Sequence, residues 1–239
     1  MGSSPVDEVV RNYAKYPRYL ADKDRLEVIK AYIRHELASL CNCPVSEIPL
    51  FRKLEGCQNK DQSATDSDCS KVYEEVCDLF YALSLIYKRK FIAKELTAEN
   101  CKWSETKIKL KLGDLILSLD NKKLKYKPLR DIHNDIGLRD EACREWREYE
   151  IKRGDSVNDP IIVVKEEKEG NTYYRILDGN GRALYWYCKS NYSLDTEIEA
   201  YVGECNGAPR DICVPFGIVH FLASMPAYFL KSLLDRFKP

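Results

Sequence analysis

The sequence predicts a protein of the α+β class, in which a helical part precedes a smaller part that mixes strands and helices. Up to about residue 97, apolar residues recur every three or four positions, which is the period of helices buried on one face. From residue 103 onward, short segments alternate apolar and polar residues or are rich in β-branched residues, as strands are. We therefore expect a helical domain at 1–100, a mixed domain at 104–205 and a helical extension at 206–239.

Three helices are predicted in the first domain. A Ser-Pro pair followed by an acidic residue starts the first helix, over residues 4–17. The second begins at Asp22 or Asp24, and Ser70 caps the third. Residues 54–70 are polar and are predicted to form a loop. The apolar stripes are Leu26, Ile29, Ile33, Leu37 and Leu40 in the second helix, and Val72, Val76, Leu79, Leu83 and Ile86 in the third.

The mixed domain is predicted to run strand, helix, strand, turn, strand, helix and strand. The alternation of "KIKLKLGDLI" predicts one opening strand, and "LRDEACREWREYEIKRG" predicts a helix that ends at Gly154. The segments "DPIIVVKEE", "NTYYRILD" and "TEIEAYVGEC" predict the remaining strands.

Composition excludes several classes of protein. No apolar run approaches the ~20 residues that span a bilayer, and the N-terminus lacks the regions of a signal peptide, so we expect a cytoplasmic protein without a membrane partner. Lys+Arg and Asp+Glu number 38 each, so no net field attracts nucleic acid. Residues 102–130, however, contain eight lysines and one arginine against three carboxylates. This basic stretch is either a DNA contact or a set of solvated strand faces.

The ten cysteines include no C-x-x-C pair, so no metal site is predicted. They are buried small residues, reactive thiols or disulfides of the kind found in hyperthermophile cytoplasm. Cys57 and Cys69 flank the polar loop and form the most natural disulfide pair.

The segment Asp178-Gly179-Asn180-Gly181-Arg182 interrupts two apolar runs and has two interpretations. Two strands joined by D-G-N-G would form an ordinary hairpin, with "ALYWYC" as the returning strand. Alternatively, the strand ends at Asp178 and a helix begins near Arg182. Backbone N–H groups at such a helix start attract anions, and Arg182 could then bind phosphate oxygens.

The order of these motifs resembles the core of the ParB/sulfiredoxin superfamily over about 100 residues. In that superfamily the glycine-containing loop and the following helix start bind nucleotide phosphates. The resemblance therefore implies phosphate contacts from Gly179, Asn180, Gly181 and Arg182. The matching residues are Pro160, Ile161, Val163, Tyr174, Arg175, Ile176, Asp178, Gly179, Arg182, Ala183, Ile198, Ala200 and Val202.

The chain departs from each branch of that superfamily. Asn180 stands where sulfiredoxins have their cysteine, and Asn180-Gly181 replaces two histidines of the serine-kinase branch. Partition proteins have G-E-R-R and continue into a helix-turn-helix that is not evident after Cys205. The leading function is a nucleotide-binding, DNA-associated ParB-like protein. If the protein is an enzyme, nucleotide hydrolysis would accompany this function. The alternatives are a nucleotide-dependent small-molecule kinase or other phosphotransferase, and a non-catalytic interaction scaffold.

The resemblance implies CTP, ATP or ADP with Mg²⁺ as cofactors. The partners are a nucleotide and DNA along residues 102–130, and a homodimer is left open. Phosphoryl transfer needs a metal ligand or base near the phosphates, for which Asp114, Asp178 and His133 are the candidates. Lys127 and Arg130 could add positive charge beside them. We expect Arg182→Ala to weaken nucleotide binding and leave the fold intact.

Overall fold

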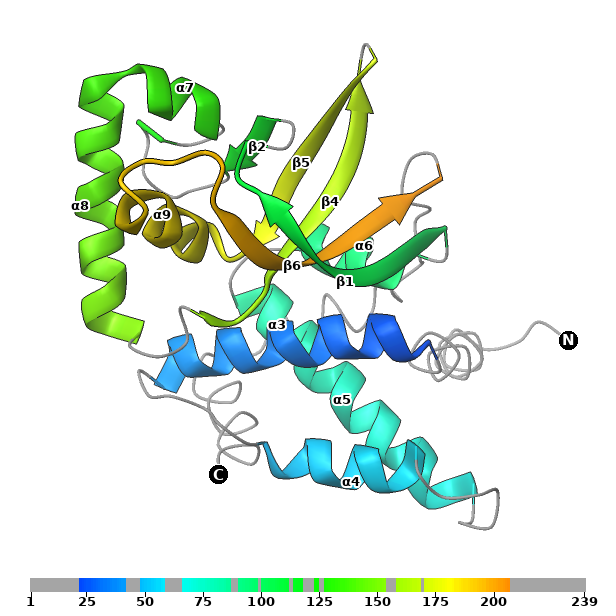
Figure 1. Ribbon diagram of the computed structural model, residues 1–239. Helices are drawn as coiled ribbons and strands as arrows, with labels where there is room; N and C mark the ends of the chain where they lie inside the picture. Colours follow the sequence, from blue (N-terminus) through cyan, green and yellow to red (C-terminus); the bar gives the residue numbers. More distant parts are fainter. Residues whose placement is uncertain are drawn as a thin grey trace, which may run out of the picture. The chain divides into compact units, whose positions relative to one another are not determined.

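The computed structural model describes residues 22–41, 48–58, 66–86, 90–98, 100–111, 114–117, 123–124, 127–153, 158–168 and 170–206. These residues form two compact units that divide near Asn100. One unit is helical, and the other contains a sheet with its own helices (Figure 1). The protein is therefore of the mixed α+β class, as predicted.

Four helices make up the described part of the first unit: α3 (Lys23–Cys41), α4 (Pro49–Gln58), α5 (Asp66–Ile86) and α6 (Lys90–Thr97). The second predicted helix is confirmed as α3, and the Asp22 carboxylate caps it by accepting the backbone N–H groups of Asp24 and Arg25 at 3.2 and 3.3 Å. The predicted loop at 54–70 is wrong at both ends. Residues 54–58 belong to α4, and α5 begins at Asp66 rather than after Ser70.

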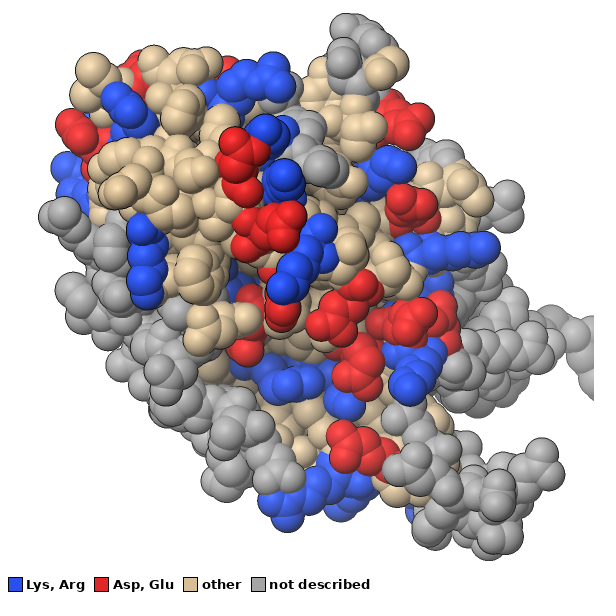
Figure 2. All heavy atoms as spheres, viewed as in Figure 1, with Lys and Arg blue, Asp and Glu red and all other residues tan. Residues whose placement is uncertain are grey.

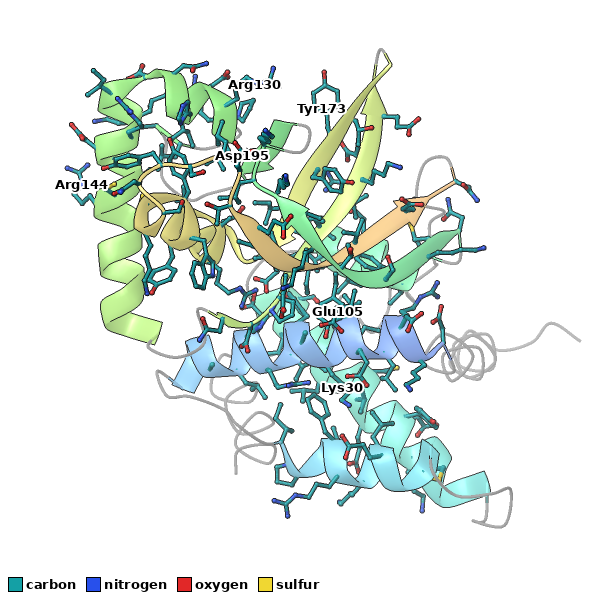
Figure 3. All side chains as sticks on the ribbon, in the orientation of Figure 1. Lys30, Glu105, Arg130, Arg144, Tyr173 and Asp195 are labelled. Carbon is teal, nitrogen blue, oxygen red and sulfur yellow. A yellow bond between two sulfur atoms is a disulfide. The ribbon has the colours of Figure 1, made fainter. Side chains whose placement is uncertain are left out.

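Apolar packing and one disulfide hold this unit together. The Tyr32 ring of α3 meets the Phe80 ring of α5 edge to face, with centroids 5.5 Å apart. Lys30, buried on α3, lies 3.0 Å from the Glu27 carboxylate and 3.3 Å from that of Glu55 on α4 (Figure 3). Cys57 at the end of α4 is bonded to Cys69 in α5, which confirms the predicted pair.

The second unit contains six strands and three helices in its described part. The strands are β1 (Cys101–Lys109), β2 (Asp114–Leu117), β3 (Lys127–Pro128), β4 (Ile161–Lys168), β5 (Asn171–Asp178) and β6 (Glu197–Cys205). The helices are α7 (Leu129–Asn134), α8 (Ile136–Arg153) and α9 (Asn180–Lys189). The predicted helix at 138–154 is confirmed as α8, and the predicted strand "NTYYRILD" coincides with β5.

The six strands form one mixed sheet in the order β1-β6-β4-β5-β2-β3. The pairs β4·β6 and β2·β5 are parallel, and the other three neighbouring pairs are antiparallel. The single opening strand predicted over 107–116 is wrong, because β1 pairs with β6 while β2 pairs with β5 on the other side of β4. An alternating sequence pattern predicts a strand but does not say which neighbour it pairs with.

One core lies between the sheet and its helices. The alternate residues Ile161 and Val163 of β4 and Tyr174 and Ile176 of β5 point into it, as the two-residue period of strands requires. The helices contribute Leu129, Ile132, Ala142, Ala183, Leu184 and Tyr187. Across the β1·β6 ladder, the directly opposite residues Cys101 and Cys205 form a second disulfide.

Several expectations lie outside the described residues. These are the helix at 4–17 and the C-terminal helical extension, apart from Asn206. Among the residues that the structure does describe, none of the helices has both the length and the apolar character that crossing a bilayer requires.

Candidate phosphate-binding site

The Asp178–Arg182 segment joins a strand to a helix. β5 ends at Asp178, Gly179 is the N-cap, and "ALYWYC" lies within α9. The hairpin interpretation is therefore wrong, and the strand–loop–helix interpretation is confirmed. Figure 1 shows α9 starting directly beyond the tip of the β5 arrow.

Gly179 is buried and has a backbone conformation that other residues rarely adopt. Its φ of 93° and ψ of 22° are left-handed, where a Cβ atom is strained. A Cβ atom at this position would also lie 2.6 Å from Cγ2 of Ile161 and 2.7 Å from Nη2 of Arg182. The glycine is thus required by packing and by the turn, independently of any ligand.

The Arg182 guanidinium turns inward. It is only 1% exposed, and its Nη2 lies 3.0 Å from Oδ2 of Asp178, which is 8% exposed. In this buried ion pair each charge compensates the other, because a buried charge without a partner is costly. Arg182 therefore braces the turn between β5 and α9, instead of projecting toward solvent.

The first turn of α9 retains the features of an anion site. Its N-cap residue is Gly179, which has no side chain with which to cap the helix. Asn180 and Gly181 are half-exposed, and the first intrahelical bond is donated by Ala183 to the Gly179 carbonyl at 3.0 Å. The backbone N–H groups of a first turn precede such bonds and carry partial positive charge.

The three predicted catalytic residues do not come together. Asp114 is opposite Tyr173, five residues before Asp178 on β5, which corresponds to roughly 16 Å along the strand. Figure 3 shows Tyr173 toward the end of β5 that is remote from α9. His133, on α7, contacts Tyr187, which is five residues or about 7.5 Å along the axis of α9 from Arg182.

His133 and Tyr187 instead form a link between α7 and α9. His133 Nδ1 lies 3.1 Å from the Tyr187 hydroxyl, and the two rings meet edge to face. Burial raises the pKa of Tyr187 above its ordinary 10.0, so the phenol stays protonated. The phenol can then donate its O–H to Nδ1 of His133. This histidine therefore has a structural role.

Lys127 and Arg130, the positive residues predicted beside the site, lie at the end of the sheet where β5 ends. Lys127 is opposite Leu117 at the carboxyl end of β2, and β2 runs parallel to β5, so both strands end on that side. Arg130 follows in the first turn of α7 (Figure 3). Both are exposed. Ligands of sheets with helices commonly bind at the carboxyl ends of parallel strands.

Several described lysines of the basic stretch at 102–130 lie opposite carboxylates. Lys111 pairs with Asp195, and Lys123 lies 3.5 Å from Glu141. Positive and negative side chains are correspondingly intermingled on the face that Figure 2 shows. The register opposite β6 is Lys102↔Glu204, Lys107↔Glu199 and Lys109↔Glu197.

The described side chains do not fit a protein-held Mg²⁺. Nowhere in the described ranges do three His, Cys, Asp or Glu side chains gather into a possible metal site. The Asp178 carboxylate is engaged by Arg182, and Asp114 is at the other end of the sheet. These side chains therefore support no step of phosphoryl transfer.

Comparison with protein-family models, with curated proteins and with solved structures returned no match.

Proposed function

We propose that the second unit binds the phosphates of a nucleotide at the start of α9. The observation that supports this most is the uncapped first turn of α9, directly after the left-handed Gly179 and at the carboxyl end of β5. A helix start of this kind presents N–H donors and the positive end of the helix dipole to an anion. The resemblance to the ParB/sulfiredoxin superfamily in the same segment favours a nucleotide as the source of the phosphate.

The donors in this proposal are the backbone N–H groups of Asn180, Gly181 and Arg182. The Arg182 side chain has a different task from the one expected, because its guanidinium binds the Asp178 carboxylate inside the protein. It holds the turn in place and so positions the amides. Lys127, exposed at the same edge of the sheet, supplies a cation for the outer phosphates.

The proposal covers binding only, and no reaction is assigned to the site. Kinase or hydrolase activity would require a base or metal ligand at the start of α9, and neither Asp114 nor His133 lies there. Association with DNA along 102–130 stays a prediction, and the carboxylates opposite its lysines weaken the expected field.

Thermal unfolding with CTP, ATP, ADP and inorganic phosphate, each with and without Mg²⁺, tests the proposal. A ligand at one hundred times its Kd adds about 2.7 kcal/mol to the free energy of unfolding. We expect at least one nucleotide to raise the Tm, and to do so more than phosphate alone. If all four leave the Tm unchanged at millimolar concentration, nucleotide binding is excluded and the interaction scaffold becomes the better interpretation.

A further inference from the structure

Two cysteines outside the disulfides face each other in the helical layer of the second unit. Cys143 on α8 and Cys188 near the end of α9 are in the thiol form, and their Sγ atoms lie 3.1 Å apart. A disulfide bond measures about 2.05 Å, so the two sulfurs need to approach by only about 1 Å more. They are 45 positions apart in the sequence, so the packing of α8 on α9 brings them together.

A strained turn places a tyrosine hydroxyl on the same thiol. The Cys143 Sγ lies 3.3 Å from the hydroxyl of Tyr192, which follows α9. Asn191 and Tyr192 have φ angles of 57° and 63°, and an aromatic residue rarely adopts that left-handed conformation. Strain of this sort persists only where surrounding contacts impose it, and it is concentrated at functional positions.

The contacts of Tyr192 explain how the strained turn is held. Its backbone N–H donates to the Tyr187 carbonyl at 2.9 Å, and its ring meets the Tyr187 ring edge to face. The Arg139 guanidinium lies 5.5 Å from the centre of the Tyr192 ring. Arg139 is also four residues before Cys143 on α8, so it shares a helix face with that thiol.

The Tyr192 hydroxyl is a polar group in contact with the Cys143 sulfur. The hydrogen bond with Cys143, followed by the electrostatic interaction with the same cysteine and by burial, raises the pKa of Tyr192, so its hydroxyl keeps its proton. A protonated hydroxyl can donate a hydrogen bond to the Cys143 sulfur when that sulfur attacks as a thiolate. Both thiols are half-buried. Arg144, the next residue of α8, projects to the side away from α9 (Figure 3).

We propose that Cys143 and Cys188 form a reversible, redox-active dithiol whose substrate is a low-molecular-weight disulfide such as oxidised glutathione. The Cys143 thiolate attacks one sulfur of the substrate, which forms a mixed disulfide and releases one thiolate. The Cys188 thiolate then attacks the Cys143 sulfur and releases the second thiolate. The two protons lost by the cysteines pass to the two released thiolates, so two cysteines are oxidised and one disulfide is reduced to two thiols.

A redox titration of the full chain tests this proposal. The protein is equilibrated without oxygen in glutathione buffers of graded GSH-to-GSSG ratio, acid-quenched, alkylated and digested without reduction for mass spectrometry. We expect a linked Cys143–Cys188 peptide that increases as the buffer becomes more oxidising and is lost on back-titration. Its midpoint should not depend on protein concentration, because both sulfurs belong to one chain.

Single variants identify the order of attack. Cys188→Ser should accumulate one glutathione on Cys143, because the second attack is removed. Tyr192→Phe should slow the reaction of Cys143 several-fold, because the donor to the thiolate is lost. The matched control is Cys77→Ser, which removes a buried thiol of the first unit and should leave the titration unchanged.

One result overturns the proposal without relying on any variant. If both cysteines of the folded wild-type chain remain fully alkylated at every buffer ratio, the pair is not redox-active. Disulfides from either cysteine to another partner, in place of the linked peptide, would also overturn it. The Cys57–Cys69 and Cys101–Cys205 peptides provide the internal standard for an intact oxidised fold.

Discussion

The Nη2 atom of Arg182 lies 3.0 Å from Oδ2 of Asp178, and this pair joins the last residue of β5 to the first turn of α9 inside the protein. The same guanidinium lies against Gly179, so three residues of the turn determine one another's positions. The turn between β5 and α9 is therefore held by an ion pair and by close packing around Gly179.

The burial of Arg182 changes what its removal should do. Arg182→Ala leaves the Asp178 carboxylate in a buried position without its cation, which costs about 3–5 kcal/mol of stability. We therefore expect a marked loss of stability rather than an intact fold with weak binding. Denaturant unfolding, monitored by circular dichroism, measures the loss.

A double variant separates charge from packing at this turn. Asp178→Asn together with Arg182→Met removes both charges and keeps much of the side-chain volume. It should be more stable than Arg182→Met alone, which keeps the same volume but leaves the Asp178 carboxylate without its cation. Equal stability of these two proteins would show that the unmatched carboxylate is not the source of the loss.

The two glycines of the loop should respond differently to the same substitution. Gly179→Ala forces a Cβ into the left-handed region and against Ile161, at a cost of about 2 kcal/mol or more. Gly181→Ala is in the first turn of a right-handed helix and should raise stability by about 0.5 kcal/mol. Thermal melts of the two variants compare them directly, and a similar loss in both would contradict the assigned backbone geometry.

Local patterns in the sequence were enough to predict α8, β4, β5 and β6 of the second unit. β5 is a run of β-branched and aromatic residues bounded by Gly170 and Gly179, and both glycines have positive φ. A helix after Asp178 was one of two interpretations, because aromatic residues suit strands as well. α4 was missed because residues 54–58 were assigned to the polar loop, although Leu50, Phe51 and Leu54 give the helix a buried face.

Features that depend on tertiary contacts were beyond the sequence patterns. A period of two predicts that residues 107–116 are extended, but only pairing with β6 and β5 divides them into two strands. The inward turn of Arg182 depends on the buried Asp178 carboxylate, and an arginine after two glycines gives no sign of that. The approach of Cys143 to Cys188 depends on how α8 packs against α9.

The two disulfides should contribute unequally to stability. Cys101–Cys205 closes a loop with a sequence separation of 104, against 12 for Cys57–Cys69. Loss of chain entropy in the unfolded state then predicts about 4.7 kcal/mol for the long loop and about 3 kcal/mol for the short one. Guanidinium unfolding of the paired variants Cys101→Ser/Cys205→Ser and Cys57→Ser/Cys69→Ser tests the order, and a larger loss from the second pair would contradict it.

Alkaline pH should destabilise the protein through Tyr187. Burial raises the pKa of this phenol in the folded state above its ordinary 10.0, so the folded state holds the proton more tightly than the unfolded state. The contribution is complete below pH 10 and is lost as the pH rises further. Stability measured from pH 8 to 11.5 should fall above pH 10. Tyr187→Phe should show a shallower fall, and an unchanged slope would exclude Tyr187 as its source.

A negative charge in the first turn of α9 should weaken nucleotide binding without harm to the fold. Gly181 is half-exposed, belongs to α9 and is not among the positive-φ glycines, so an aspartate can adopt its backbone conformation. A carboxylate near a helix start stabilises the helix by about 0.3–1 kcal/mol, yet it repels a phosphate at the same amides. Isothermal titration calorimetry with the nucleotide that raises the Tm should therefore show at least tenfold weaker binding. Gly181→Ala is the matched control, because it adds the same Cβ without the charge and should bind like the wild type. If Gly181→Asp binds as tightly as Gly181→Ala, the phosphates are not at the start of α9, whether or not the nucleotide binds elsewhere.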